Sequence, residues 1–203
     1  MAKPSDQVFV NCPFDEGYKP MFDAIVFAIT DLGFVARSAR EDDDAGEFRL
    51  AKIQRIIAEC KFGVHDISAV HLDAQHGLPR FNIPLELGLF LGCKQYGGTA
   101  QRNKVSLIFD AAPHRYQIFI SDIAGQDIHS HGRNVETAIG EIRKWLATAS
   151  KRKRLPGGRV IFERYEGFLA VLPALCTELK LQPAEVTFRD LRQMIVDWLK
   201  RNR

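Results

Sequence analysis

The stretch VFVNCPFDEGYKPMFDAIVFAITDLGFVA, residues 8–36, predicts a strand, a helix and a second strand in succession. The apolar runs at 8–10 and 34–36 are short, as expected of buried strands. Between them, Pro20 opens a helix, where its missing N–H costs nothing, and Gly33 follows the helix at a typical C-terminal position. The helix carries one apolar stripe at helical spacing, which consists of Phe22, Ile25, Val26, Ile29 and Leu32.

The same alternation of short apolar runs and helix-period segments continues to about residue 150. Strands that alternate with helices pair in parallel through right-handed crossovers, and strands this short and apolar are typical of a sheet covered on both faces. We therefore predict an α/β fold with an open, doubly wound parallel sheet over residues 1–150. Further strands are predicted at 62–64 and 105–109, and further helices over 50–57, from Asn82 onward and over 135–148.

Residues 151–203 break this alternation. The segment 151–158 is a basic connector rich in Pro and Gly, and two helical stretches follow at 165–179 and 188–201. The second stretch has one apolar face, and such a face needs a surface to cover. We predict that this basic linker and C-terminal helical extension form an appendage of the α/β domain.

The composition is that of an ordinary globular protein. The 203 residues include 28 Lys and Arg against 25 Asp and Glu, which gives a formal net charge of +3, and 46% of the residues are hydrophobic. This balance argues against disorder, collagen and a protein that coats nucleic acid. No apolar run approaches the ~20 residues of a membrane span, and residues 1–7 contain no apolar signal region. We therefore expect a cytoplasmic protein without a membrane partner.

Several common kinds of site have no signature in the chain. The four cysteines contain no C-x-x-C pair, and His65, His71 and His76 match no familiar ligand spacing, so we predict neither a metal nor a cofactor. The fingerprints G-x-G-x-x-G, G-x-x-x-x-G-K-[ST] and G-x-S-x-G are also absent. Their absence argues against a dehydrogenase, a P-loop nucleotidase and a serine hydrolase with a nucleophile elbow.

Two neighbouring segments carry the clearest candidate chemistry, because ligands of doubly wound sheets bind beyond the carboxyl ends of the strands. Asp66 lies just past a strand end, and Ser68 follows it. Asn82 is a good N-cap for the next helix, which would place Glu86 in the first turn among leucines. Each carboxylate also has a structural interpretation, as a capping or salt-bridging group at Glu86 and as an Asx turn at Asp66.

The loops after the first two strands lead to the same edge of the sheet. Asn11 and Asp15 can hold a ribose or a phosphate, and Phe14 either stacks on a base or is pinned in the core. Arg37 follows the second strand and can bind an anionic group of a ligand. The acidic run at 41–44 is more typical of a solvated surface than of a metal site.

The motifs Asp66-Ile67-Ser68 and Asn82-x-x-x-Glu86-Leu87-Gly88 resemble those of the nucleoside 2-deoxyribosyltransferase-like group. That group is related in fold to bacterial Toll/interleukin-1 receptor (TIR) domains. The segments 8–15 and 116–128 also resemble bacterial TIR-like proteins. The resemblance covers about residues 7–148, implies a flavodoxin-like form of the predicted sheet and leaves the C-terminal helices unexplained.

The resemblance implies cleavage of an N-glycosidic bond. In the transferases the Glu of the Glu-Leu-Gly motif attacks the anomeric carbon of a nucleoside, and in TIR enzymes a similarly placed Glu cleaves the nicotinamide–ribose bond of NAD. Here the corresponding residue is Glu86. The pair 82–83 is Asn-Ile where the transferases have Gly-Thr, which argues against deoxynucleoside transfer. Asp66 or Asn82 would hold the sugar hydroxyls, and His65 or Asp15 would protonate a neutral purine as it leaves.

We therefore expect an N-glycosidase that acts on NAD or on a related nucleotide or nucleoside. The TIR resemblance also implies a role in bacterial antiphage defence and assembly into a homo-oligomer. The alternative is a catalytically silent module that binds nucleotides or directs assembly. A weaker alternative is nucleic-acid contact through residues 151–154, although four basic residues beside Pro and Gly are more typical of a solvated linker.

Overall fold

The computed structural model of the chain describes residues 3–41, 44–70, 72, 75–79 and 81–203. Within these residues, five strands form one sheet in which all neighbours are parallel. Their spatial order is β2 (Val35–Arg37), β1 (Gln7–Asn11), β3 (Phe62–Asp66), β4 (Val105–Asp110) and β5 (Ile128–Ser130). This is the flavodoxin-like order 2-1-3-4-5, so the prediction of a doubly wound parallel α/β sheet is confirmed.

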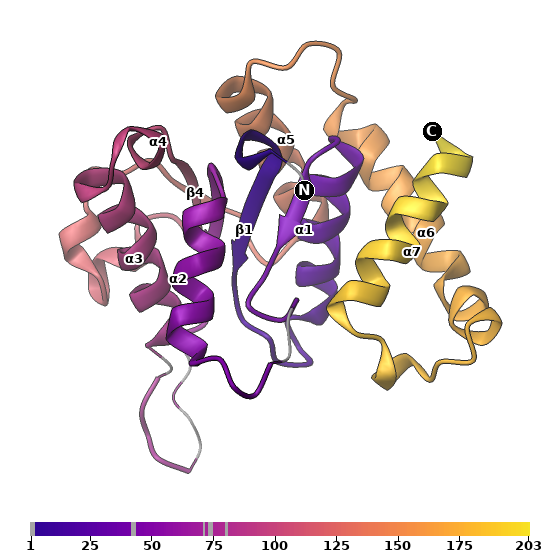
Figure 1. Cartoon of the computed structure of the whole chain (residues 1–203), viewed down its shortest axis with the longest axis horizontal. Coiled ribbons are helices and arrows are strands. Elements are labelled where there is room, and N and C mark those ends of the chain that lie inside the picture. Colours follow the sequence, from indigo (N-terminus) through magenta and orange to yellow (C-terminus); the bar gives the residue numbers. More distant parts are fainter. Residues whose placement is uncertain (1–2, 42–43, 71, 73–74, 80) are drawn as a thin grey trace.

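Helices cover both faces of the sheet (Figure 1). Helices α1 and α5 pack on one face, α2 and α3 pack on the other, and α6 and α7 form a further layer outside α1. The helices are α1 (Lys19–Asp31), α2 (Arg49–Glu59), α3 (Asn82–Tyr96), α4 (Thr99–Arg102), α5 (Val135–Ser150), α6 (Gly158–Glu178) and α7 (Phe188–Asn202). Short 3-10 helices lie at Pro4–Asp6, Arg115–Ile118, Ser121–Ile123 and Pro183–Glu185.

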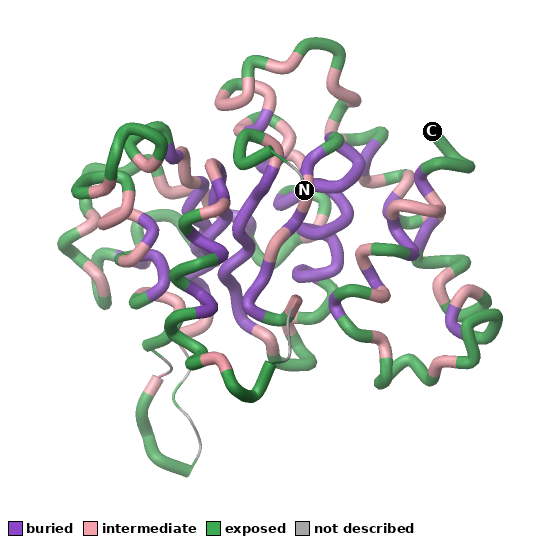
Figure 2. Tube along the Cα trace, in the orientation of Figure 1, coloured by how far each residue is buried: buried purple, intermediate pink, exposed green. Residues whose placement is uncertain are grey.

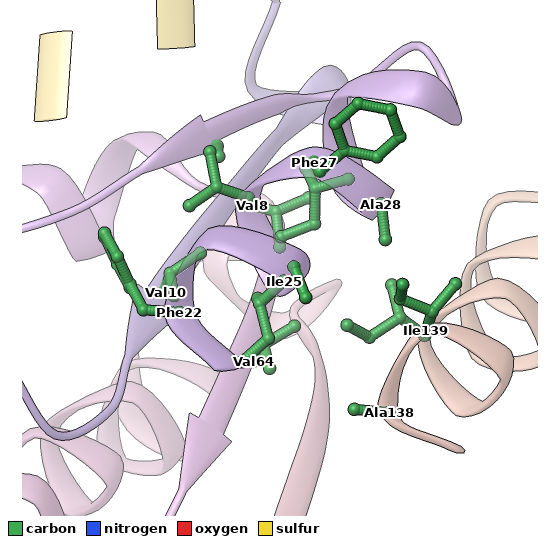
Figure 3. Close-up of a cluster of buried hydrophobic side chains, with 14 of the residues drawn as sticks. Val8, Val10, Phe22, Ile25, Phe27, Ala28, Val64, Ala138 and Ile139 are labelled. Atoms are coloured by element: carbon green, nitrogen blue, oxygen red, sulfur yellow. The ribbon is translucent and has the colours of Figure 1, made fainter. Parts of the chain in front are cut away.

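Helix α1 lies at the centre of this arrangement and is buried all round. Every residue from 21 to 31 is buried, and Figure 2 shows buried backbone concentrated around β1 and α1. Figure 3 shows Ala138 and Ile139 of α5 facing Ile25 and Ala28 of α1. A helix with no exposed side needs a partner on each face, and the sheet with α5 supplies only one of them.

The C-terminal helices supply the other partner, mainly through Phe27. This ring is fully buried, and its centroid lies 5.5 Å from that of Tyr165, 5.6 Å from that of Phe168 and 6.0 Å from that of Trp198. These distances are typical of favourable aromatic pairs. The apolar face predicted for the extension therefore covers α1.

The connector before α6 is tied to the domain. The Arg152 guanidinium lies 3.8 Å from the centroid of the Phe34 ring, pairs with Asp6 at 2.5 Å and donates to the carbonyl oxygen of Gly33 at 2.8 Å. Lys151, Lys153 and Arg154 are exposed. One of the four basic residues thus holds the connector against the sheet layer, which a solvated linker would not require.

Strand β5 and the start of α6 differ from the sequence-based expectation, and α4 and the 3-10 helices were not predicted. Strand β5 was not predicted, because its three residues contain a single apolar side chain and show no pattern. Helix α6 begins at Gly158, seven residues before the predicted start. A Cβ atom on Gly158 would lie 3.1 Å from the Gly140 Cα of α5, so two glycines at this crossing let the helices approach closely.

We expect Phe27→Ala to lower the free energy of unfolding by about 3–5 kcal/mol, because it leaves a cavity between α1 and the C-terminal helices. Urea unfolding followed by circular dichroism measures the change. Phe48→Ala is the matched control, since Phe48 is 85% exposed, and it should change stability by no more than about 0.5 kcal/mol. Equal unfolding midpoints for the two variants would contradict the role given to Phe27.

Candidate functional site at the carboxyl ends of β1 and β3

The order of the strands reverses between β1 and β3, and ligands of such sheets bind at this switch point. Asn11 ends β1 and is paired in register with His65 of β3. The Asn11 Nδ2 atom donates to the carbonyl oxygen of Ile83 at 3.0 Å and lies 3.1 Å from His65 Nδ1. Asn11 is 2% exposed, so it joins the start of α3 to the edge of the sheet.

Asp66 is the centre of a buried polar cluster at this edge. Its Oδ1 accepts the backbone N–H of Ser68 at 2.8 Å, which is the Asx turn considered from the sequence. Its Oδ2 accepts the Tyr18 hydroxyl and lies 3.0 Å from His131 Nε2. Because Asp66 is fully buried and both oxygens face protein groups, it positions Tyr18 and His131.

His131 belongs to the site although no motif or spacing pointed to it. Its Nδ1 accepts the backbone N–H of Arg133 at 2.9 Å, so the proton of the neutral ring lies on Nε2, which faces Asp66. His131 directly follows β5. Because this strand was not predicted, the sequence did not indicate that the loop at its carboxyl end belongs to the site. Recognition of β5 would have directed attention to this histidine.

A cavity of about 430 Å³ adjoins the cluster. Tyr18, Ser68 and His131 contribute to its wall, together with Asp15 from the loop after β1. Its volume lies in the range of small-molecule sites. The pKa of Tyr18 is raised mainly by burial and further by the Asp66 carboxylate. The phenol therefore stays protonated and can donate a hydrogen bond.

Glu86 is a buried carboxylate for which the described residues provide no bonding partner. It is 7% exposed, and the described residues offer its carboxylate neither a hydrogen bond nor an ion pair. Burial raises its pKa from 4.5 to about 7, against a smaller opposing effect of Arg49. The expected first-turn position is wrong, because α3 has Phe81 at its N-cap and Glu86 is the fifth residue of the helix. Capping therefore does not explain this carboxylate.

Cys12 connects Glu86 with the buried cluster. Burial is the main cause that raises the pKa of its thiol, and the carboxylates of Asp66 and Glu86 raise it further. Both carboxylates therefore act on the same buried thiol at the end of β1. The thiol is 1% exposed and protonated, which makes it a neutral buried group rather than a nucleophile.

The residues of the loop after β1 have mixed surroundings. Phe14 is half-buried, and its ring packs edge-to-face on Phe22 with centroids 5.6 Å apart, as the core interpretation predicts. Asp15 is exposed and accepts the backbone N–H of Tyr18 at 3.0 Å, so it shapes the turn that presents the phenol. Ser68 is 7% exposed and lies in the wall of the 430 Å³ cavity.

Three other residues selected from the sequence have different environments. Arg37 donates to Glu41 at 2.7 Å and to Glu59 at 2.9 Å, beside a separate groove at the β2 edge. Asn82 is exposed at the start of α3, one turn before Glu86. His65 is fully buried, and burial lowers its pKa to about 3, so it stays neutral and enclosed and is unsuited to protonate a leaving group. His71, Asp42 and Asp43 lie outside the described residues.

Within the described part of the chain, no group of three or more His, Cys, Asp or Glu side chains is arranged to hold a metal ion. None of the described helices is both long and apolar enough to span a membrane. Comparison of the chain with models of protein families finds no match, and comparison with curated proteins finds none either.

We expect Glu86→Gln to stabilise the protein increasingly as the pH rises. The folded state holds the Glu86 proton up to about pH 7, whereas the unfolded chain releases it near 4.5, so wild type loses stability between these values. Glutamine does not titrate, so the free energy of unfolding of Glu86→Gln should exceed that of wild type by an amount that grows by up to about 3 kcal/mol between pH 4.5 and 8. Urea unfolding at several pH values measures it.

Glu163→Gln is the control, because Glu163 is exposed on α6. Its effect on the unfolding midpoint should be small and should not grow with pH in this way. A pH-independent difference between Glu86→Gln and wild type would show that the Glu86 carboxyl is not desolvated in the folded protein.

Proposed function

We propose that the protein is an N-glycosidase that cleaves the base–ribose bond of NAD or of a related nucleotide, with Glu86 acting at the anomeric carbon. The observation that carries this proposal is the buried carboxylate of Glu86 beside the switch point of the sheet, which has no hydrogen-bond or ion-pair partner in the part of the chain that the structure describes. Burial of a carboxyl group without a partner is costly, and such groups are concentrated at functional sites.

The chemistry of the reaction suits this carboxylate. Cleavage of an N-glycosidic bond develops positive charge on the sugar, and a nearby carboxylate stabilises that charge or traps it covalently. A site with little water strengthens the interaction. A positively charged substrate also favours the ionised form of Glu86, so binding of a ribosyl pyridinium would lower a pKa that is about 7 in the free protein.

Burial of His65 disfavours a neutral purine as leaving group unless Asp15 serves as the acid. His65, one of the two acids considered for a neutral purine, is fully buried with a pKa of about 3. Nicotinamide leaves NAD as a neutral molecule from a cationic ring, so its departure requires no acid. In this proposal Tyr18 and His131, held by Asp66, contact the ribose or phosphate from the 430 Å³ cavity.

We expect wild type to release nicotinamide from NAD faster than it releases adenine from adenosine. The rate of nicotinamide release by Glu86→Gln should be lower than that of wild type by at least about 100-fold. The rate for wild type should rise with pH and level off above about pH 7, because the ionised carboxylate is the active form. Chromatography of the released base measures both effects, and protein concentration is varied because assembly can be required for activity.

Glu163→Gln serves again as the matched control and should retain wild-type release. Full activity of Glu86→Gln would overturn the role of Glu86. Calorimetric binding of NAD without any base release over the whole concentration range would overturn the enzyme proposal and favour a nucleotide-binding module.

A further inference from the structure

The 430 Å³ cavity beside Asp66 carries polar groups that the N-glycosidase proposal does not use. Three loops contribute to its wall, and each of them follows a strand of the sheet. The loop after β1 provides Asp15, the loop after β3 provides Ser68, and the loop between β5 and α5 provides Arg133. The three side chains therefore meet at the carboxyl edge of the sheet, around one cavity.

Arg133 is a cation without a carboxylate partner among the described residues. Its backbone N–H donates to His131 Nδ1 at 2.9 Å, and its φ is 57°, a conformation that residues other than glycine seldom adopt. His131 in turn lies 3.0 Å from Asp66, so the backbone of Arg133 is fixed while its side chain is exposed in the cavity wall. A guanidinium group with free N–H donors binds phosphate strongly, often through two parallel hydrogen bonds.

Ser68 supplies a second donor from a rigid position. Its backbone N–H donates to Asp66 at 2.8 Å, and its carbonyl oxygen accepts Arg115 at 2.8 Å. The residue is 7% exposed, yet its hydroxyl has no hydrogen-bond partner among the described residues and is not sealed from the cavity. A hydroxyl group that is mostly buried and still free to donate is suited to a ligand.

The first turn of α5 adds backbone donors to the same side of the cavity. The Asn134 side chain accepts the Thr137 N–H at 2.8 Å, whereas the N–H groups of Val135 and Glu136 have no acceptor among the described residues. Val135 lies in the cavity wall. The start of a helix favours an anion, and the Glu136 carboxylate is paired with Arg159 at 3.2 Å.

The opposite side of the cavity, at the start of α1, presents acceptors. The Asp15 carboxylate is exposed and accepts the Tyr18 N–H through one oxygen at 3.0 Å. The Tyr18 hydroxyl donates its proton to Asp66, so toward the cavity it can only accept. A ligand with an anionic group at one end and hydroxyl groups at the other matches both sides, whereas a bare anion or a neutral sugar matches one.

We propose that the 430 Å³ cavity binds a sugar phosphate, with the phosphate on Arg133, Ser68 and the first turn of α5. The sugar hydroxyls donate to Asp15 and Tyr18. Assignment of this ligand to the substrate rests on the N-glycosidase proposal and makes Arg133 the residue that selects nucleotides over nucleosides. Pro13 of the cavity wall follows Cys12, the thiol on which the charge of Glu86 acts, so the two sites are neighbours.

Ribose 5-phosphate is the probe. Calorimetric titration of the full chain should give a dissociation constant in the millimolar range or below, as expected for so small a ligand. Ribose and inorganic phosphate each carry one part of the probe, and each should bind at least about tenfold more weakly. Inorganic phosphate that binds as tightly as ribose 5-phosphate would overturn the assignment to a sugar phosphate.

Two variants test whether the probe binds in this cavity. Arg133→Gln removes the cation and should weaken binding of ribose 5-phosphate at least about tenfold, and Ser68→Ala should weaken it about threefold or more. Arg154→Gln is the matched control, because Arg154 is also exposed, also has a positive φ of 61° and lies on the connector outside the cavity wall. Absence of binding at about 10 mM probe, or equal binding by Arg133→Gln and Arg154→Gln, would overturn the proposal.

A comparison of two substrates separates this proposal from the first one. Nicotinamide mononucleotide and nicotinamide riboside differ only in the phosphate, and kcat/KM for nicotinamide release should be at least about tenfold higher for the mononucleotide. Arg133→Gln should reduce this ratio at least about fivefold. Equal values for the two substrates in wild type would overturn the assignment of the cavity to the substrate.

Glu86→Gln should bind ribose 5-phosphate within about threefold of wild type, since the phosphate site does not include this carboxylate. Retained binding of the probe by a wild-type protein that releases no base would refute the N-glycosidase proposal and support the sugar-phosphate site.

Discussion

Helix α1 is buried on two opposite sides, because the sheet and α5 pack against one side while α6 and α7 pack against the other. Asp31, near its C-terminal end, is fully buried and accepts hydrogen bonds from Arg164 at 3.1 Å and from Arg203 at 3.2 Å. Removal of either arginine would leave a buried charge with one partner fewer, which is expensive. The extension is therefore bound to the domain by apolar packing and by charge.

The start of the same helix borders two separate cavities. Tyr18 is the residue just before α1 and reaches Asp66 at the edge of the sheet, while Phe22 and Asp23 in its first turns contribute to the wall of a second cavity of about 490 Å³, between α1 and the start of α7. The loop before α1 has Asp15 in the walls of both cavities. A movement of α1 against α6 and α7 would thus alter the positions of side chains at both places.

The two carboxylates of the motif region have opposite environments. Asp66 is completely buried, and each of its oxygens faces a donor, so its charge is compensated and its role is to hold Tyr18 and His131. Glu86 is almost as buried but has no donor among the described residues, and its pKa rises to about 7. The folded protein therefore bears the free-energy cost of an uncompensated buried carboxyl group at Glu86 but not at Asp66. The N-glycosidase proposal gives a functional reason for that cost.

The amino-acid sequence by itself determined the alternation of strands and helices that makes the sheet parallel, because apolar runs and helical stripes depend only on which residues follow one another. The strands around 8–10, 62–64 and 105–109 and the helices between them were recognised in this way, and the carboxyl-end rule led directly to Asp66 and Glu86. Only the tertiary structure decided what these residues contact. Arg37 pairs with Glu41 and Glu59, and His65 is enclosed in the core. His131 reaches Asp66 across 65 residues of chain, from the end of a strand that has only one apolar side chain. The physical reason is that periodicity is a local property, whereas burial, ion pairing and pKa depend on atoms brought together from distant parts of the chain.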